Sequence, residues 1–307
     1  MSQPPRVSVV VSAYNHEKYI RALLDSILNQ TFKNYELIII DDGSTDSTAD
    51  VIEEVAKQYP EKIRFIRQQN NGLARTINTA FKMCRGEYIA PVGSDDVWLP
   101  NKLQEQIGKF DEDPQLSLVY SDINVISEDG EVLYRYNKFV KPYWGQIAEH
   151  LFAGNFISGI VPMYKRELFE KFGYWDERYI IASDYEFSLR ISPYIKVGYV
   201  NKVLALYRIH KHNSSILSAE RVILESLSVI EDFLVSHPGL IKKSVILRTK
   251  SILYLRLVKA YIIKKDGKKA IKYGIKSCYC NLLLLWSYIS FVFILPGGAR
   301  CDCEKKR

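Results

Sequence analysis

The sequence predicts an α/β fold with a mostly parallel, Rossmann-like sheet and a C-terminal helical appendage. Apolar runs typical of buried strands alternate with amphipathic helical patterns over the first third of the 307-residue chain. Such alternation favours a parallel sheet with helices on both faces. Polar residues directly follow several of these runs, at the carboxyl strand ends where such folds bind ligands. From residue 216 onward, apolar residues recur at helical spacing.

The expected strands and helices of the first third follow one another in strict alternation. The strand runs are rich in Val and Ile, which is typical of strands buried on both faces. The helical runs carry apolar residues three or four positions apart. The expected strands are Val7–Ser12, Tyr35–Ile40, Ile63–Ile66 and Gly86–Val92, and the helices between them are Glu17–Gln30, Thr48–Tyr59 and Leu73–Cys84.

The middle of the chain is less regular, but we expect it to complete a domain over residues 1–215. A tail domain over residues 216–307 would follow. The expected middle strands are Leu116–Ile126, Ile157–Tyr164 and one or two within Tyr194–Ile209, and the helices are Trp144–Phe152, Arg166–Phe172 and Ser183–Ile191, the last capped by Ser183 or Asp184. The expected tail helices are Ile216–Val235, Ile241–Lys264 and Lys268–Cys278.

Composition indicates a globular protein of a reducing compartment. Apolar residues make up 47% and charged residues 25% of the chain, which is ordinary for a globular domain. Five cysteines, mostly near the C-terminus, imply no disulfide framework. The N-terminus lacks the pattern of a signal peptide. We therefore expect a cytoplasmic protein.

The tail predicts contact with a membrane surface rather than with nucleic acid. Residues 241–307 hold 16 Lys and Arg against 3 Asp and Glu, although the whole chain carries only +7. An apolar stretch of 14 residues, Leu282–Leu295, lies in this basic region. A spanning helix needs about 20 apolar residues. We therefore favour a helix in the plane of the inner membrane face over a spanning helix or a soluble, buried one.

Two acidic pairs stand at the ends of expected strands. Asp95 and Asp96 follow the fourth strand, and adjacent carboxylates there are costly without a positive partner. Hard oxygen ligands suit Mg²⁺ or Mn²⁺, so a divalent cation is the expected partner. Asp41 and Asp42 follow the second strand. The plainer alternatives are a solvated acidic turn for the first pair and a capped turn before a helix for the second.

The order of these motifs resembles the family-two inverting glycosyltransferases, which have the glycosyltransferase A fold. The resemblance covers roughly residues 5–215 and implies a role in bacterial cell-surface glycan synthesis. It is carried by Val9-Val10-Val11-Ser12-Ala13-Tyr14-Asn15, by Ile39-Ile40-Asp41-Asp42-Gly43-Ser44-Thr45-Asp46, and by Gly86-Glu87-Tyr88-Ile89 leading to Ser94-Asp95-Asp96.

The resemblance implies a role for each residue at the donor end of the site. Ser12 and Tyr14 would line the base and ribose of a nucleotide sugar, and Asp42 would accept a hydrogen bond from the base. Asp96 would bind Mn²⁺ or Mg²⁺, which neutralises the leaving diphosphate. Asp95 would hold the ribose or orient the loop.

The resemblance also implies a general base and a third metal contact. Asp184 matches the position of the family's base, although Ser183 replaces the usual Glu beside it. The alternative for Asp184 is a plain helix cap, and it could serve both purposes. His210 is chosen over His212 by motif position, as a metal ligand or phosphate contact, and the alternative is a structural histidine.

The leading hypothesis is a metal-dependent inverting glycosyltransferase. It would move a sugar from a nucleoside diphosphate sugar to a hydroxyl of a glycan or lipid-linked acceptor. A non-catalytic nucleotide-sugar-binding protein on the same fold is one rival. A nucleotidyltransferase is another, but the basic, glycine-rich phosphate loop it would want near the N-terminus is absent from the sequence. No Gly-x-Gly-x-x-Gly follows the first strand, which argues against a dinucleotide oxidoreductase.

Overall fold

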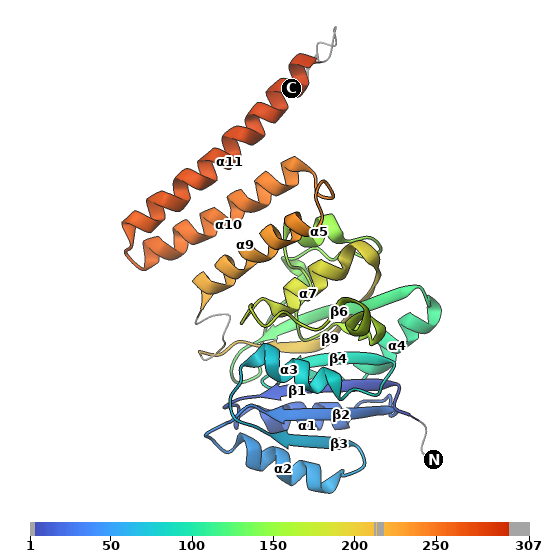
Figure 1. Ribbon diagram of the computed structural model, residues 1–307. Helices are drawn as coiled ribbons and strands as arrows, with labels where there is room; N and C mark the ends of the chain where they lie inside the picture. The colour runs from blue at the N-terminus through green and yellow to red at the C-terminus, as the bar shows by residue number, and fades with distance from the viewer. Residues whose placement is uncertain (1–3, 212, 214–217, 295–307) are drawn as a thin grey trace, which may run out of the picture. The chain divides into compact units, whose positions relative to one another are not determined.

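A computed structural model describes residues 4–211, 213 and 218–294, with side chains as far as residue 283. The chain divides into two compact units, Met1–His237 and Pro238–Arg307 (Figure 1). The predicted division after residue 215 differs from this one. The helix α9 (Ala219–Ser236) packs against α7 (Ser183–Ile191) and belongs to the first unit.

The first unit is built on one sheet with the strand order β3-β2-β1-β4-β8-β6-β9-β5, and β7 pairs with β6 at the side. The first four strands in this order run parallel to one another, β6 and β9 are parallel to each other, and the remaining pairs are antiparallel. The predicted α/β fold with a largely parallel sheet is thereby confirmed. The strands are β1 (Val7–Ala13), β2 (Tyr35–Asp41), β3 (Ile63–Arg67), β4 (Tyr88–Gly93), β5 (Val97–Trp98), β6 (Leu116–Ile126), β7 (Val132–Arg135), β8 (Met163–Lys165) and β9 (Lys196–Arg208).

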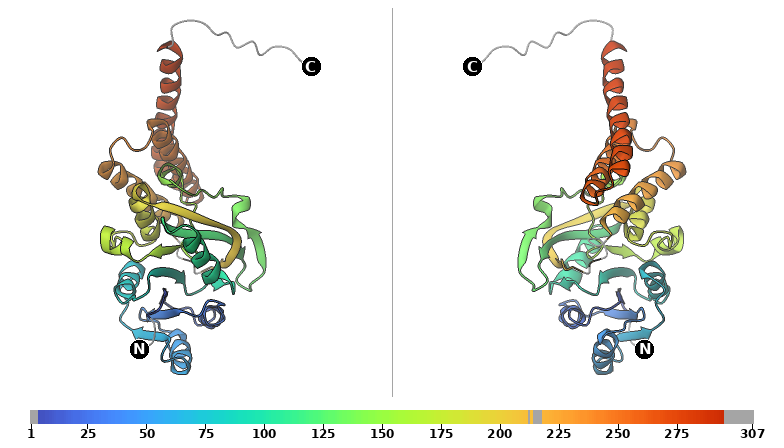
Figure 2. Two further views of the ribbon diagram at one scale, coloured as in Figure 1. Left: turned by 90° about the vertical axis from the view of Figure 1, so that its right-hand side faces the viewer. Right: turned by 90° about the vertical axis from the view of Figure 1, so that its left-hand side faces the viewer.

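Helices cover both faces of the parallel half of the sheet. Figure 2 shows α3 on one side of the strands and α1 on the other, and α1 also contacts α2. Each buries one apolar stripe, which explains the spacing seen in the sequence. The helices of the first unit are α1 (Ile20–Leu28), α2 (Thr48–Gln58), α3 (Leu73–Lys82), α4 (Lys102–Glu112), α5 (Ala148–Ala153), α6 (Glu167–Phe172), α7 and α9, with short 3₁₀ turns at Tyr136–Lys138 and Ser192–Tyr194.

Three sequence expectations in the middle of the chain were wrong. The strand expected at Ile157–Tyr164 is reduced to β8, which pairs antiparallel with β4 and β6. The residues before it form turns instead, and they line a cavity. The helix expected from Trp144 begins only at Ala148. Neither Ser183 nor Asp184 caps α7, whose N-cap residue is Ala182.

The second unit is a helical hairpin of α10 (Lys243–Ile263) and α11 (Gly267–Ile294). A buried polar contact joins the two helices, since the hydroxyl oxygens of Ser251 and Ser277 lie 2.9 Å apart. The Ser251 hydroxyl also donates to Asn281 Oδ1 at 3.1 Å. The predicted helical appendage is thereby confirmed.

Within the described residues, no helix is both long enough and apolar enough to cross a membrane. Most of the apolar stretch Leu282–Leu295 lies outside the residues whose side chains are described, as do Cys301 and Cys303. Cys84, Cys278 and Cys280 are free thiols, as expected.

Candidate functional site

A cavity of about 1020 Å³ opens at the carboxyl ends of the parallel strands. The strand register brings its walls together, because Ser12 pairs with Ile40 on one side and with Gly93 on the other. The loops that follow β1, β2 and β4 must therefore meet at one edge of the sheet. Six of the seven predicted site residues line this cavity: Ser12, Tyr14, Asp42, Asp95, Asp96 and Asp184.

The loop after β1 is fastened to the loop after β2. Asn15 adopts a left-handed backbone with φ of 53°, which Asn tolerates better than most residues. Its backbone N–H donates to Ser44 Oγ at 3.0 Å, and its side-chain oxygen accepts from the backbone N–H of Thr45 at 2.8 Å. Tyr14, which is 46% exposed, is left on the rim of the cavity.

Asp42 organises the part of the cavity wall that precedes α3. Its carboxylate accepts hydrogen bonds from the side chain of Gln68 at 2.8 Å and from the backbone N–H groups of Asn71 and Gly72, both at 2.9 Å. It is 2% exposed, and the three donors stabilise its charge. Asp42 therefore holds the loop before α3 against the cavity. The turn alternative applies to its neighbour Asp41, whose Oδ2 accepts the backbone N–H of Ser44 at 3.1 Å. At the start of α2, Asp46 accepts the backbone N–H of Thr48 at 3.0 Å.

The acidic pair lies where the backbone leaves no room for a side chain. A Cβ atom on Gly93 would stand 2.6 Å from Asp96 Oδ2 and 2.9 Å from Asp95 Oδ1. Asp96 is buried and accepts the backbone N–H of Arg208 at 3.0 Å. Asp95 Oδ2 lies 3.0 Å from His210 Nε2 and accepts from Asn213 Nδ2 at 3.1 Å. Glycine is thus required for both carboxylates to sit side by side.

The two carboxyl groups differ in their affinity for a proton. Burial and the neighbouring carboxylate of Asp95 raise the pKa of Asp96 well above its usual value. Burial also acts to raise the pKa of Asp95, but the hydrogen bond from His210 and the nearby His16 lower it overall. Like charges so close favour one shared proton or a bound cation.

One group of side chains in the described part of the chain is placed to hold a metal ion. Donor atoms of His16, Asp95 and His210 all lie within 4.8 Å of one another. The ring centroids of the two histidines are 5.6 Å apart. Two imidazoles and a carboxylate fit a divalent transition metal such as Mn²⁺ better than Mg²⁺, which prefers oxygen ligands. Asp96 is not in this group, although it follows Asp95 directly in the sequence.

Asp184 reaches the cavity from α7. It is the second residue of α7, and its Oδ1 accepts the backbone N–H of Tyr185 at 2.7 Å. Its other carboxylate oxygen fits only because residue 159 is glycine, since a Cβ there would stand 2.6 Å from Asp184 Oδ2. Burial raises the pKa of Asp184 to about 6, against backbone hydrogen bonds that lower it. A carboxylate with this pKa can accept a proton near neutral pH.

Sequence reasoning missed two residues of this site, His16 and Asn213, and a third residue, Glu225, that bonds to the backbone beside it. His16 stands in the turn after β1, and only its closeness to the strand end signalled a role. Asn213 follows His210 and donates to Asp95. Glu225 lies in α9, outside the expected catalytic domain, and nothing in the sequence pattern of that helix indicated a contact near the site.

Comparisons with known proteins agree with this geometry. The model of the family described as Glycosyl transferase family 2 matches residues 8–173. An uncharacterized glycosyltransferase of Rickettsia typhi is 32% identical over 213 residues, covering 67% of this chain and 64% of that protein. The chondroitin synthase of Escherichia coli is 30% identical over 236 residues, covering 74% of this chain and 33% of that protein. The chain therefore spans less than two thirds of either relative.

Solved structures share the fold at low sequence identity. S. aureus TarS 1–349 in complex with UDP-GlcNAc has a TM-score of 0.61 and 18% identity, with 89% of this chain and 91% of that chain covered. A mannosyltransferase of Pyrobaculum calidifontis in complex with GDP-Man and Mn²⁺ has a TM-score of 0.57 and 16% identity, with 93% and 88% covered.

Proposed function

Because this chain belongs to glycosyl transferase family 2, we propose that it transfers a sugar from a nucleoside diphosphate sugar to an acceptor hydroxyl with inversion. One observation carries this proposal. A single cavity collects the nucleotide-side residues Ser12 and Asp42, the acidic pair and the carboxylate of Asp184. A carboxylate of raised pKa in the same cavity favours an enzyme over a non-catalytic binding protein.

The donor would lie across the strand ends. Ser12 and Tyr14 would contact the base and ribose, and Asp42 would accept a hydrogen bond from the base; all three line the cavity. We propose Asp96 and His210 as cation ligands by their motif positions. The short distances around Asp95 favour adding it and His16 to the ligand set. A bound divalent cation supplies charge neutralisation to the departing diphosphate.

Asp184 would act as the general base. It takes the proton of the acceptor hydroxyl while that oxygen bonds to the anomeric carbon from the face opposite the diphosphate. The bond from the anomeric carbon to the phosphate oxygen breaks, and the nucleoside diphosphate leaves with the electron pair. Attack from the opposite face inverts the anomeric centre.

The context that we propose is cell-surface polysaccharide or glycolipid synthesis. Relatives include proteins named chondroitin synthase and hyaluronan synthase, the second from Pasteurella multocida and 29% identical over 217 residues. The acceptor would then be a hydroxyl of a growing glycan or of a lipid-linked sugar.

A donor screen tests this function. The purified chain is titrated with UDP- and GDP-sugars, including UDP-GlcNAc and GDP-Man, with Mn²⁺, with Mg²⁺ and with EDTA. We expect one donor to bind with a cation and, with acceptor, to release free nucleoside diphosphate. Release of pyrophosphate would indicate donor synthesis instead. Binding without release across an acceptor panel would favour the non-catalytic alternative.

Gly159→Ala should impair catalysis without removing a functional group. The new Cβ would stand 2.6 Å from Asp184 Oδ2, so the carboxylate has to move. A shift of about 1 Å in a catalytic group can cost about 10²-fold in rate, and we expect a loss of that size in kcat. The control is Gly154→Ala, where an added Cβ meets no atom within 4 Å. Equal kcat values for the two variants would contradict the placement of Asp184.

We also propose that the second unit rests on the cytoplasmic face of a membrane. On α11, Ile271, Ile275 and Tyr279 form a stripe at four-residue spacing, each more than 60% exposed. Exposed apolar side chains are expected to bury themselves in a bilayer surface, and the 16 basic residues of this region are expected to attract anionic lipid. The proposed membrane association therefore rests on this apolar stripe and on the basic charge of residues 241–307.

Vesicle binding checks this association. The double variant Ile271→Glu and Ile275→Glu should bind vesicles containing phosphatidylglycerol at least tenfold more weakly than the unaltered chain. Burying each isoleucine is worth about 1.5–3 kcal/mol. The control is Val235→Glu, which alters an 83% exposed residue of the first unit. The proposal is wrong if the double variant pellets like the unaltered chain, or if neutral vesicles bind equally well.

A further inference from the structure

A carboxylate on α9 is bonded to the backbone just before the helix that carries Asp184. Glu225 Oε2 accepts the backbone N–H groups of Ile181 at 2.8 Å and Ala182 at 3.0 Å, and its Oε1 accepts that of Ile180 at 3.2 Å. Three consecutive N–H groups thus converge on one side chain that lies more than 40 residues further along the chain. Glu225 itself is only 9% exposed.

These bonds anchor, from another element, the N-cap residue of α7 and the two residues before it. The N-cap residue of α7 is Ala182, which has no side chain that could accept a hydrogen bond. The first N–H groups of a helix have no partner within it, and negative charge is favoured at that end. Glu225 supplies the charge. Burial acts to raise its pKa, but the three backbone hydrogen bonds lower it overall, so the carboxylate stays ionised at neutral pH.

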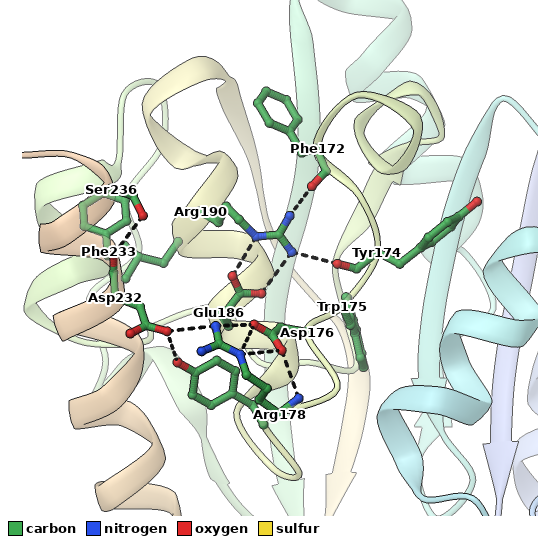
Figure 3. Close-up of polar contacts among 12 residues, drawn as sticks. Phe172, Tyr174, Trp175, Asp176, Arg178, Glu186, Arg190, Asp232, Phe233 and Ser236 are labelled. Atoms are coloured by element: carbon green, nitrogen blue, oxygen red, sulfur yellow. Dashed lines mark hydrogen bonds and ion pairs between the residues drawn. The ribbon is translucent and has the colours of Figure 1, made fainter.

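A second carboxylate on the same helix holds the preceding residues. Asp232 lies seven positions after Glu225, which places both on one face of α9. Its Oδ2 accepts the hydroxyl of Tyr179 and a guanidinium N–H of Arg178, both at 2.9 Å. Figure 3 shows Asp232 and Arg178 facing each other, with Asp176 on the other side of the guanidinium.

The loop held in this way is also a wall of the cavity. Trp175, Ile180 and Ile181 line it, and the chain then runs into α7 and reaches Asp184. On the N-terminal side of the loop, Arg190 donates to the backbone oxygens of Phe172 and Tyr174 (Figure 3). The loop is therefore fastened at both ends, and α9 holds the end next to the base.

We infer that Glu225 is a positioning residue for the transfer reaction, which fixes the start of α7 and with it the carboxylate of Asp184. This inference rests on the proposed role of Asp184 as base. Among the described residues, Glu225 bonds to the cavity lining only through the backbone N–H groups of Ile180 and Ile181. Its loss should therefore affect the proton-transfer step far more than donor binding.

The test uses the full chain with Glu225→Gln, which keeps the shape but replaces one accepting oxygen by an NH₂ group. We expect kcat to fall about 10-fold to 100-fold, donor Kd to change less than twofold, and the acid limb of the pH profile to shift. Amide hydrogen exchange at Ile180–Ala182 should become faster. Glu225→Asp should be slower than the unaltered chain but faster than Glu225→Gln.

Arg221→Gln is the matched control. Arg221 donates to Glu225 Oε1 at 2.9 Å, so this change removes the partner of the carboxylate and leaves the three backbone bonds. We expect its kcat to stay within about twofold of the unaltered chain. An unchanged kcat in Glu225→Gln would overturn the inference, as would parallel losses of folding and donor binding. Absence of transfer by the unaltered chain would instead refute the proposed function, while hydrogen exchange would still report on the backbone contacts.

Discussion

Asp184→Asn is expected to lower the rate of glycosyl transfer about 10²-fold to 10⁴-fold, the range associated with loss of a general base. The amide has the shape of the carboxylate but cannot take the acceptor proton. Donor binding should be retained, because Asp184 stands on α7, whereas the nucleotide-side residues Ser12 and Asp42 stand at the ends of β1 and β2. Steady-state kinetics and donor titration of the purified variant measure the two effects separately.

The pH dependence gives an independent check of the same residue. The pKa of Asp184 is raised to about 6, chiefly by burial. Only the ionised carboxylate can act as base, so kcat/KM should fall about tenfold per pH unit below pH 6.

The raised pKa also has a consequence for stability. The folded state binds this proton more tightly than the unfolded state, whose Asp titrates near 3.8. The free energy of unfolding therefore falls as pH rises from about 4 to 6 and then levels off. At pH 7 the Asn variant should melt at a slightly higher temperature than the unaltered chain.

The control for both measurements is Asp50→Asn, which alters an exposed acid in the first turn of α2. It should leave rate and pH profile unchanged, and it should not raise the melting temperature, because it removes a favourable negative charge from the first turn of a helix. Full transfer activity in purified Asp184→Asn would refute the assignment of the base.

Asp96→Asn is expected to reduce transfer about 10²-fold or more and to remove the effect of Mn²⁺ on donor binding. A metal ligand contributes several kcal/mol to charge stabilisation at a leaving group, and each 1.36 kcal/mol is a factor of ten in rate. Calorimetric titration with Mn²⁺, with and without donor, measures the loss of the cation directly. The protein should stay folded, because the amide can still accept the backbone N–H of Arg208.

Variants of the neighbouring residues show which of the two carboxylates binds the cation. Asp95→Asn and His210→Ala should each weaken Mn²⁺ binding at least tenfold, because their donor atoms lie together with that of His16. If Asp96→Asn binds Mn²⁺ normally and only Asp95→Asn fails, the ligand is Asp95 and the motif-based assignment of Asp96 is wrong. If none of the variants alters Mn²⁺ binding, no cation is held at this edge.

The local spacing of apolar residues was sufficient to predict the strands that position the site. Val9, Val10, Ile38 and Ile39 are fully buried, as their place in apolar runs predicted. A strand buried on both faces can be recognised from its own residues, and parallel strands end at the same edge. The loops after β1, β2 and β4 could therefore be expected to converge, and the cavity lies where they meet.

The second half of the first unit was harder to predict, because its elements depend on their partners. β8 is a strand of three residues that exists through its pairing with β4 and β6. The chain before it, which was expected to be strand, turns at Gly159 to leave space for Asp184. A short run of apolar residues looks the same in the sequence whether it forms a buried strand or a buried turn, because the spacing of apolar residues does not distinguish them.

The sequence by itself determined the α/β class, the helical tail and the strand ends at which the polar motifs gather, because these follow from the local spacing of apolar residues. Only the tertiary structure brought His210 to Asp95, 115 residues away, set His16 beside them, and placed Glu225 against the backbone that leads to Asp184. Such contacts join side chains of different elements, and their distances depend on how those elements pack, which no local pattern encodes.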